Sequence, residues 1–221
     1  MVIHGYDIIY LHDAAKNLGE MIDYSVNDKG LEGEQILDMF IVSGYADQFE
    51  NGNPRVIAGM NGVELAIEVI ETVKGSSQYI KPSNRYYRTP EYWVGWILAQ
   101  YQWYKAKKFI QILQGISYDD ILRMYPTLHE ADVTKFYSIA DDMLKTRLPD
   151  TNLKRLREEA GLSQSKLANM SKVTLRSIQV YEQKNRDINK AQVSTIAKIA
   201  GVLRCDIAEL MEVNNRYEIF S

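Results

Sequence analysis

Hydrophobic positions along the first 145 residues recur with helical spacing. Residues 6–24 carry apolar side chains three, seven and four positions apart, at Ile8, Leu11, Leu18 and Ile22. Similar stripes run through residues 35–45 and 61–73. Because side chains three and four positions apart share one face of an α-helix, each stripe predicts a helix with one buried face. No stretch shows the period of two that is typical of a half-buried strand, so the predicted fold class is all-α.

Turn and capping residues predict the remaining helices of this region. Thr89 precedes Pro90 and Glu91, a combination that favours a helix start and predicts a long aromatic helix to about residue 107. Ser117 is suited to cap a helix over residues 118–124, and a further helix is expected over residues 129–144. Pro54 suits the first turn of a short helix, and the polar segment 75–88 is predicted to be a long loop.

A domain boundary is predicted at residues 146–151. Pro149 disfavours helical geometry at Leu148, so the preceding helix should end there, and Asp150 or Thr151 can cap the next helix. The sequence therefore predicts an all-helical domain over residues 1–147 and a second domain over residues 148–221.

The distribution of charge supports two domains with different partners. Residues 1–150 carry 14 lysines and arginines against 21 aspartates and glutamates, whereas residues 151–221 carry 12 against 8. A basic module joined to an acidic one suggests a nucleic-acid-binding unit attached to a unit that does not touch nucleic acid.

Five short helices are predicted in the second domain. The first spans residues 152–160, faces the core with Leu153, Leu156 and Ala160, and ends at Gly161 as a left-handed C-cap. Ser163 caps the second, over residues 164–171, which buries Leu167 and Ala168. Thr174 caps the third, over residues 175–183, which buries Ile178 and part of Tyr181, and Val173 fills the turn between the second and third helices.

The last two helices complete this predicted core. The fourth is expected to follow a cap at Asn189, to end at Gly201, and to bury Val193, Ile196, Ala197 and Ala200. The fifth is expected over residues 205–212, with Ile207 and Leu210 packed inside.

This region resembles the Cro/repressor-type helix-turn-helix family, also called the XRE family. The resemblance covers about 60 residues and is carried by Leu162-Ser163-Gln164, Leu167-Ala168, Val173, Ile178 and Tyr181-Glu182. It implies a five-helix, lambda-repressor-like DNA-binding domain and a transcriptional regulator whose partner is double-stranded DNA. One departure is Lys172, which stands where the family usually has glycine. A left-handed conformation there costs a non-glycine residue about 1 kcal/mol.

The resemblance also implies which side chains contact DNA. The third helix of this family enters the major groove, where each base pair presents a distinct pattern of donors and acceptors. Its outward residues are expected to read bases: Thr174, Leu175, Arg176 and Gln179. Arg176 can donate two hydrogen bonds to guanine, and Gln179 can pair with adenine. Thr174 and Leu175 can meet a thymine methyl group, or Thr174 can meet a phosphate. Leu175 as a dimer contact is the alternative.

Phosphate contacts are expected on both sides of this helix. Ser163 and Gln164 lie at the start of the second helix, whose N-terminus suits an anion. Lys184, Asn185 and Arg186 follow the third helix and could clamp the DNA backbone.

The sequence predicts no enzyme, no cofactor and no metal. His4, His12 and His129 lack metal-ligand spacing, and there is no glycine-rich phosphate loop or nucleophile elbow. Cys205 is the single cysteine and is expected to pack or cap. The chain shows neither a signal peptide nor a membrane span, so a cytoplasmic location without membrane contact is expected.

Nine tyrosines and tryptophans lie between residues 79 and 104. They could line the core of the first domain, form a surface for a partner or a second copy, or line a ligand pocket. Segments such as Glu91-Tyr-Trp-Val-Gly-Trp96 resemble uncharacterised helical domains of bacterial toxin-associated regulators. Two functions follow: a repressor that acts as a homodimer, or an antitoxin-like protein whose first domain binds a partner protein while the second autoregulates its operon.

Overall fold

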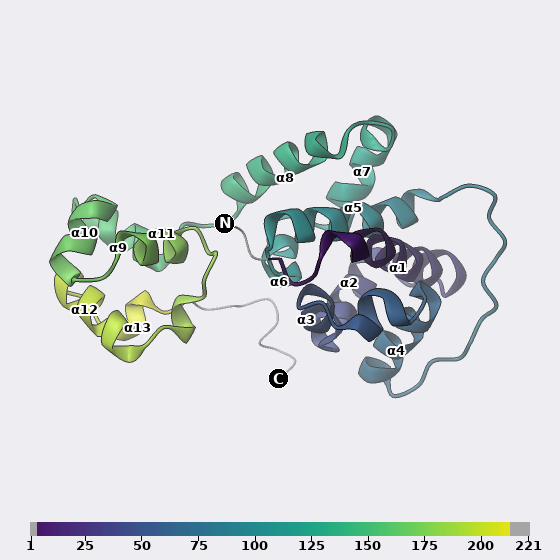
Figure 1. Ribbon diagram of the computed structural model, residues 1–221, viewed down its shortest axis with the longest axis horizontal. Helices are drawn as coiled ribbons and strands as arrows, with labels where there is room; N and C mark the ends of the chain where they lie inside the picture. Colours follow the sequence, from purple (N-terminus) through teal and green to yellow (C-terminus); the bar gives the residue numbers. More distant parts are fainter. Residues whose placement is uncertain (1–3, 213–221) are drawn as a thin grey trace. The chain divides into compact units, whose positions relative to one another are not determined.

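The computed structural model describes residues 4–212, and the chain folds as two compact units, Met1–Leu148 and Pro149–Ser221 (Figure 1). Every regular element of the described residues is helical, which confirms the all-α prediction. No helix within residues 4–212 is long and apolar enough to cross a membrane.

Unit 1 holds eight α-helices, one 3-10 turn and two π-helical turns within its described residues. The α-helices are α1 (Leu11–Asp23), α2 (Gly33–Val42), α3 (Tyr45–Glu50), α4 (Gly62–Lys74), α5 (Pro90–Lys105), α6 (Phe109–Leu113), α7 (Tyr118–Leu128) and α8 (Val133–Arg147). The turns are the 3-10 turn η1 (Ile8–Tyr10) and the π-helical η2 (Tyr24–Asp28) and η3 (Arg55–Gly59).

Helices α1 and α5 pack against each other at an unusually short distance. A Cβ atom added to Gly95 would lie 2.3 Å from the carbonyl oxygen of Leu18, and one added to Gly19 would lie 2.8 Å from the ring of Tyr92. Only glycine therefore allows the two backbones to approach in this way. The crossing fixes α5 at the centre of the hydrophobic core of unit 1.

Edge-to-face aromatic contacts join further helices of unit 1. Phe40 of α2, Phe49 of α3 and Phe109 of α6 contact one another edge to face, with ring centroids 5.2 to 6.0 Å apart. Phe136 of α8 contacts Trp93 and Tyr101 of α5 in the same geometry, at 5.9 Å in each pair. Such pairs contribute more to stability than the burial of their surface area alone. They therefore hold α2, α3, α6 and α8 to the rest of the unit.

Residues 75–89 form the long loop that the sequence predicts, without helix or strand. The hydroxyl of Tyr24 donates to the carbonyl oxygen of Ile80 at 2.8 Å and accepts from its backbone N–H at 3.0 Å. The Arg85 guanidinium pairs with Asp28 at 2.9 Å and Asp23 at 3.1 Å. These bonds hold the loop against α1 and η2.

The nine clustered aromatic residues differ widely in exposure. Tyr92, Trp93 and Tyr101 on α5 are buried in unit 1, where they serve its core. Tyr86 and Tyr87 on the loop are 99% and 88% exposed. Tyr79 on the loop and Tyr104 near the end of α5 are exposed as well, so most of the aromatic residues that a partner could reach lie on the loop.

Several expectations for unit 1 need correction. Ile8 and Val42 are exposed, although both stand on predicted buried stripes, because Ile8 lies in η1 ahead of α1 and Val42 ends α2. Helix α8 begins at Val133 rather than residue 129, because the Asp132 side chain caps it. Helices α3 and α6 have six and five residues, too few to show a period, and were not predicted.

Unit 2 begins after an extended residue and a helix cap. Leu148 is extended, with φ −81° and ψ 126°, and the Thr151 hydroxyl caps α9 by accepting from the Lys154 N–H at 3.1 Å. Asp150 instead pairs with the Lys154 ammonium at 2.7 Å. The elements are α9 (Asn152–Glu159), α10 (Gln164–Ser171), α11 (Leu175–Glu182), η4 (Ile188–Lys190), α12 (Val193–Leu203) and α13 (Ile207–Leu210).

The fourth predicted helix is wrong at both ends. Asn189 lies in η4 and caps nothing, because its side chain exchanges hydrogen bonds with the backbone of Glu212 at 2.7 and 2.9 Å. Helix α12 therefore starts at Val193, which is 72% exposed. Gly201 lies inside α12, and the helix ends where Arg204 takes the left-handed conformation at φ 55°.

The buried residues of unit 2 also differ from the prediction at a few positions. Ala197 is exposed, and Ile199 is buried together with Ile196 and Ala200. Ala160 and Ile207 are exposed rather than packed, because each stands at the end of a shorter helix than predicted. Cys205 is half-buried, and its burial raises the pKa of the thiol above its ordinary value.

Candidate nucleic-acid interface

Helices α10 and α11 are joined by a tight turn whose caps the sequence predicts correctly. The Ser163 hydroxyl accepts from the Lys166 N–H at 3.2 Å, and the Thr174 hydroxyl accepts from the Ser177 N–H at 3.1 Å. Each cap satisfies one of the N–H groups that a helix start leaves without an intrahelical acceptor. Lys172 ends α10 at φ 57° and ψ 29°, so the left-handed conformation expected at this position is confirmed.

The inner faces of these two helices are fixed by a compact core. Leu167 of α10 and Ile178 of α11 are fully buried with Leu153 of α9. Tyr181 is buried beside them, and the half-buried Val173 packs against this cluster from the turn. Because these side chains fill the interior, the remaining face of α11 is directed to solvent.

The outward face of α11 begins with three exposed residues in succession. Thr174, Leu175 and Arg176 are exposed, and Gln179 is half-buried one turn further along. The Thr174 hydroxyl is also hydrogen-bonded to the Ser177 hydroxyl at 2.8 Å. The Thr174 hydroxyl is therefore engaged within the start of the helix.

A buried ion pair joins α9 to the end of α11. Arg157 donates to Glu182 at 2.6 Å from Nε and 3.0 Å from Nη2, and the Glu182 side chain is 2% exposed. Arg157 also donates to the Leu162 carbonyl oxygen at 2.7 Å. The hydrogen bonds from Arg157 to Glu182 raise the pKa of the guanidinium above its ordinary value. The pair therefore sets the position of α11 relative to α9 and to the loop before α10.

Gln164 belongs to the same network. Its side-chain nitrogen donates to Glu182 Oε2 at 2.8 Å, across from the start of α10 to the end of α11. The sequence predicts a phosphate contact for Gln164 and assigns no role to Glu182 beyond the family match. In this structure the Gln164 amide holds the two helices together, while the N-terminus of α10 still presents backbone N–H groups.

The turn after α11 carries the three remaining predicted contacts. Lys184 takes the left-handed conformation at φ 54°, and the backbone N–H groups of Asn185 and Arg186 both donate to the Val180 carbonyl oxygen. The Asn185 side chain donates to Gln183 at 3.1 Å. The turn is thus ordered by its own backbone and places Lys184, Asn185 and Arg186 directly after the outward face of α11.

Two capped helices around a tight turn, with an exposed second helix, define a helix-turn-helix DNA-binding domain. Residues 153–210 match the family model described as Helix-turn-helix, and this part of the chain is a domain of the XRE type found in DNA-binding transcription regulators. That family is one of regulators rather than enzymes. Comparison with curated proteins gave no match, and comparison with solved structures gave none.

Metal-ligating side chains do not gather in the described part of the chain. Residues 4–212 contain no group of three or more histidine, cysteine, aspartate or glutamate side chains that could hold a metal ion.

Proposed function

We propose that this chain is a transcriptional repressor that binds operator DNA as a homodimer and reads bases with the outward face of α11. The observation that carries the proposal is that Thr174, Leu175 and Arg176 are exposed at the start of α11. The opposite face of this helix packs on the core of unit 2, and its C-terminal end is held by the buried ion pair of Arg157 and Glu182. A rigid helix that presents its N-terminal turn suits entry into the major groove. A regulator of this kind works in the cytoplasm.

Each predicted contact has a defined chemical role in the proposal. Arg176 donates two hydrogen bonds to guanine O6 and N7, and Gln179 pairs with adenine. Leu175 and the Thr174 methyl group contact thymine methyl groups. The start of α10 at Ser163 and Gln164 receives one phosphate, and the turn with Lys184, Asn185 and Arg186 receives another.

A homodimer follows from the small size of the reading surface. One α11 reads only a few base pairs, and two copies on half-sites one helical turn apart, about 10–10.5 base pairs, multiply affinity and specificity. Unit 1 then supplies dimerisation or sensing.

Binding to the DNA upstream of its own gene tests the proposal. Full-length protein should bind this DNA as a dimer in fluorescence anisotropy and analytical ultracentrifugation, and should lower expression from a reporter under the same promoter. Arg176→Ala should weaken binding by roughly ten- to hundredfold, because a bidentate contact to guanine is lost. Lys198→Ala removes an exposed lysine from α12 and is the matched control. Failure to bind, or equal binding by both variants, would show that the proposal is wrong.

An antitoxin-like role is the second candidate, and the exposed loop of unit 1 favours it. Tyr86 and Tyr87 stand almost fully exposed in residues 75–89, and Tyr79 is also exposed. Tyrosine is enriched where proteins bind one another, because it contributes a large apolar area and a polar tip. In this role unit 1 binds and neutralises a toxin encoded beside the gene, while unit 2 represses the operon.

Co-expression with the product of an adjacent gene separates the two candidates. An antitoxin-like chain should co-purify with that product and restore growth, and replacing Tyr86 and Tyr87 by serine should abolish both effects. Tyr10→Ser, on η1 outside the loop, is the matched control. If no stable complex forms, the antitoxin-like role is wrong and the repressor remains as the proposed function.

A further inference from the structure

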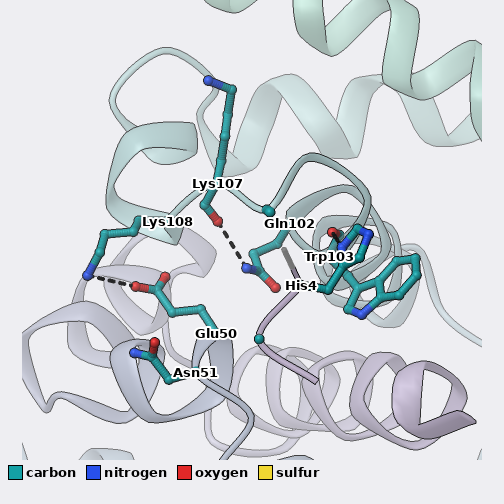
Figure 2. A pocket seen from close by; sticks show the side chains of 9 residues that line it. His4, Glu50, Asn51, Gln102, Trp103, Lys107 and Lys108 are labelled. Atoms are coloured by element: carbon teal, nitrogen blue, oxygen red, sulfur yellow. Dashed lines mark hydrogen bonds and ion pairs between the residues drawn. The ribbon is translucent and has the colours of Figure 1, made fainter. Parts of the chain in front are cut away.

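Unit 1 contains a cavity of about 250 Å³ at the C-terminal end of α5 (Figure 2). The lining residues come from the chain ahead of η1, the end of α3 and the end of α5, and include His4, Glu50, Asn51, Gln102 and Trp103. All of them belong to unit 1. This volume lies just below the ~300–1,000 Å³ that holds drug-sized ligands, so it suits a small metabolite.

Gln102 places an acceptor without a partner against this cavity. Its side chain is 4% exposed, and its amide nitrogen donates to the Lys107 carbonyl oxygen at 3.0 Å. Because a carbonyl oxygen can only accept, this bond fixes the orientation of the amide and turns Oε1 the other way (Figure 2). Oε1 has no hydrogen-bond partner among the described residues. A buried acceptor left in this way costs free energy, which a bound donor would recover.

Other lining side chains also offer acceptors. His4 Nδ1 lies 2.8 Å from the Trp103 carbonyl oxygen, so Nδ1 carries the proton and Nε2 is an acceptor in the neutral ring. Asn51 uses its amide nitrogen to donate to the Asp47 carbonyl oxygen at 2.7 Å, which leaves its oxygen to accept. A ligand that satisfies this set of acceptors must bring hydrogen-bond donors.

The Glu50 carboxylate and the C-terminal end of α5 favour a cation at the cavity. The charged residues that line the cavity are Glu50, Lys107 and Lys108, and the Lys108 ammonium is shared between Glu50 at 3.1 Å and Asp47, outside the lining, at 3.0 Å. Figure 2 shows the Lys107 side chain extending away from Glu50 and Gln102, with its carbonyl group directed toward Gln102. The cavity also lies at the C-terminal turn of α5, a helix of 16 residues, where the backbone carbonyl groups favour positive charge.

The side chain of Glu50 is 8% exposed beside the cavity. Burial raises the pKa of Glu50 above its ordinary value, although the Phe109 N–H donates to it at 2.9 Å and Lys108 lies beside it. A second positive charge nearby would offset this cost of burial.

We propose that this cavity binds a small organic cation, an alkylammonium or guanidinium compound, whose N–H groups donate to Gln102 Oε1 and to the Glu50 carboxylate. The ligand would make unit 1 a sensor domain, which goes beyond the repressor function and does not depend on it. His4, stacked on Trp103 with ring centroids 4.0 Å apart, forms one wall of the site.

Four probes of similar length test this assignment on the full-length protein without DNA. Putrescine and agmatine carry ammonium and guanidinium groups, 1,4-butanediol is the neutral counterpart of putrescine, and succinate is the anionic one. Isothermal titration calorimetry and thermal unfolding should show saturable binding and a raised Tm for at least one of the two cations. The diol and the dianion should bind at least roughly tenfold more weakly, because neither brings a positive charge to the Glu50 carboxylate.

Two variants and one control locate the binding. Gln102→Met removes Oε1 at similar side-chain length, and Glu50→Gln removes the negative charge; each should weaken cation binding by roughly tenfold or more. Gln100→Met lies on the same helix, outside the lining residues, and should bind as the wild type does. If the Gln102→Met variant does not fold, two measurements still test the proposal. They are cation binding by Glu50→Gln and the preference of the wild type for cations over the diol and succinate. The proposal is overturned if neither cation binds, if the diol binds equally well, or if Glu50→Gln leaves binding unchanged.

Discussion

Units 1 and 2 are both built from helices, but their helices are held together by different kinds of contact. In unit 1, α1 and α5 meet through Gly19 and Gly95, and aromatic edges join the surrounding helices. In unit 2, short helices start at their own capping residues, and one buried ion pair joins α9 to α11. Unit 1 should therefore be most sensitive to added volume at the helix crossing, and unit 2, beside its apolar core, to the loss of one member of the ion pair.

The largest expected effect is the loss of the buried ion pair of unit 2. Arg157→Ala leaves the Glu182 carboxylate buried without its partner, which should cost unit 2 about 3–5 kcal/mol in free energy of unfolding. Circular dichroism should show this loss. Tryptophan fluorescence should stay unchanged, because all three tryptophans lie in unit 1.

A double variant distinguishes a buried charge from lost packing. Arg157→Met combined with Glu182→Leu removes both charges and should restore part of the stability. If the double variant loses as much free energy of unfolding as the two single variants lose when added together, the ion pair does not act as a unit.

The second effect concerns the helix crossing of unit 1. Gly95→Ala places a Cβ atom against the backbone of Leu18 and Gly19, and overpacking of this kind costs about 1–3 kcal/mol. Tryptophan fluorescence should report the loss, while DNA binding by unit 2 stays intact. Gly201→Ala is the matched control, because a Cβ atom there meets nothing within 4 Å in α12 and should stabilise unit 2 by up to about 1 kcal/mol. If Gly95→Ala and Gly201→Ala change the free energy of unfolding equally, the close approach of α1 and α5 is contradicted.

The smallest effect concerns the turn between α10 and α11. Lys172 takes the left-handed conformation, so Lys172→Gly should stabilise unit 2 by about 1 kcal/mol in urea unfolding. Lys198→Gly makes the same change inside α12 and should destabilise by about 1 kcal/mol. Destabilisation by Lys172→Gly would mean that the lysine side chain contributes contacts of its own.

The positions of helices follow from the sequence where one residue and its near neighbours decide them. Thr89, Ser117, Ser163 and Thr174 each cap a helix, because a hydroxyl accepts from an N–H three residues later. Gly201 shows the limit of such reasoning. Glycine permits a helix end but does not require one, and Arg204 takes the left-handed conformation instead.

Features that join distant positions could not be predicted in the same way. Arg157 and Glu182 lie 25 residues apart, and nothing in the local pattern of either shows that they meet. The cavity of unit 1 joins His4, Glu50 and Gln102 from three separate segments. In the candidate site, Thr174, Leu175 and Arg176 were predicted from a recurrent motif, whereas the network that holds their helix was visible only in three dimensions.

The most direct test of the reading face of α11 is the base preference of its side chains. Wild-type protein, Arg176→Ala and Gln179→Ala should each be used to select binding sites from a pool of random double-stranded DNA. The account predicts that Arg176→Ala loses the preference for guanine at one position of each half-site, that Gln179→Ala loses it for adenine at another, and that the remaining positions stay selected. Selected sequences that are the same for all three proteins would contradict the account, because α11 would then not read the bases.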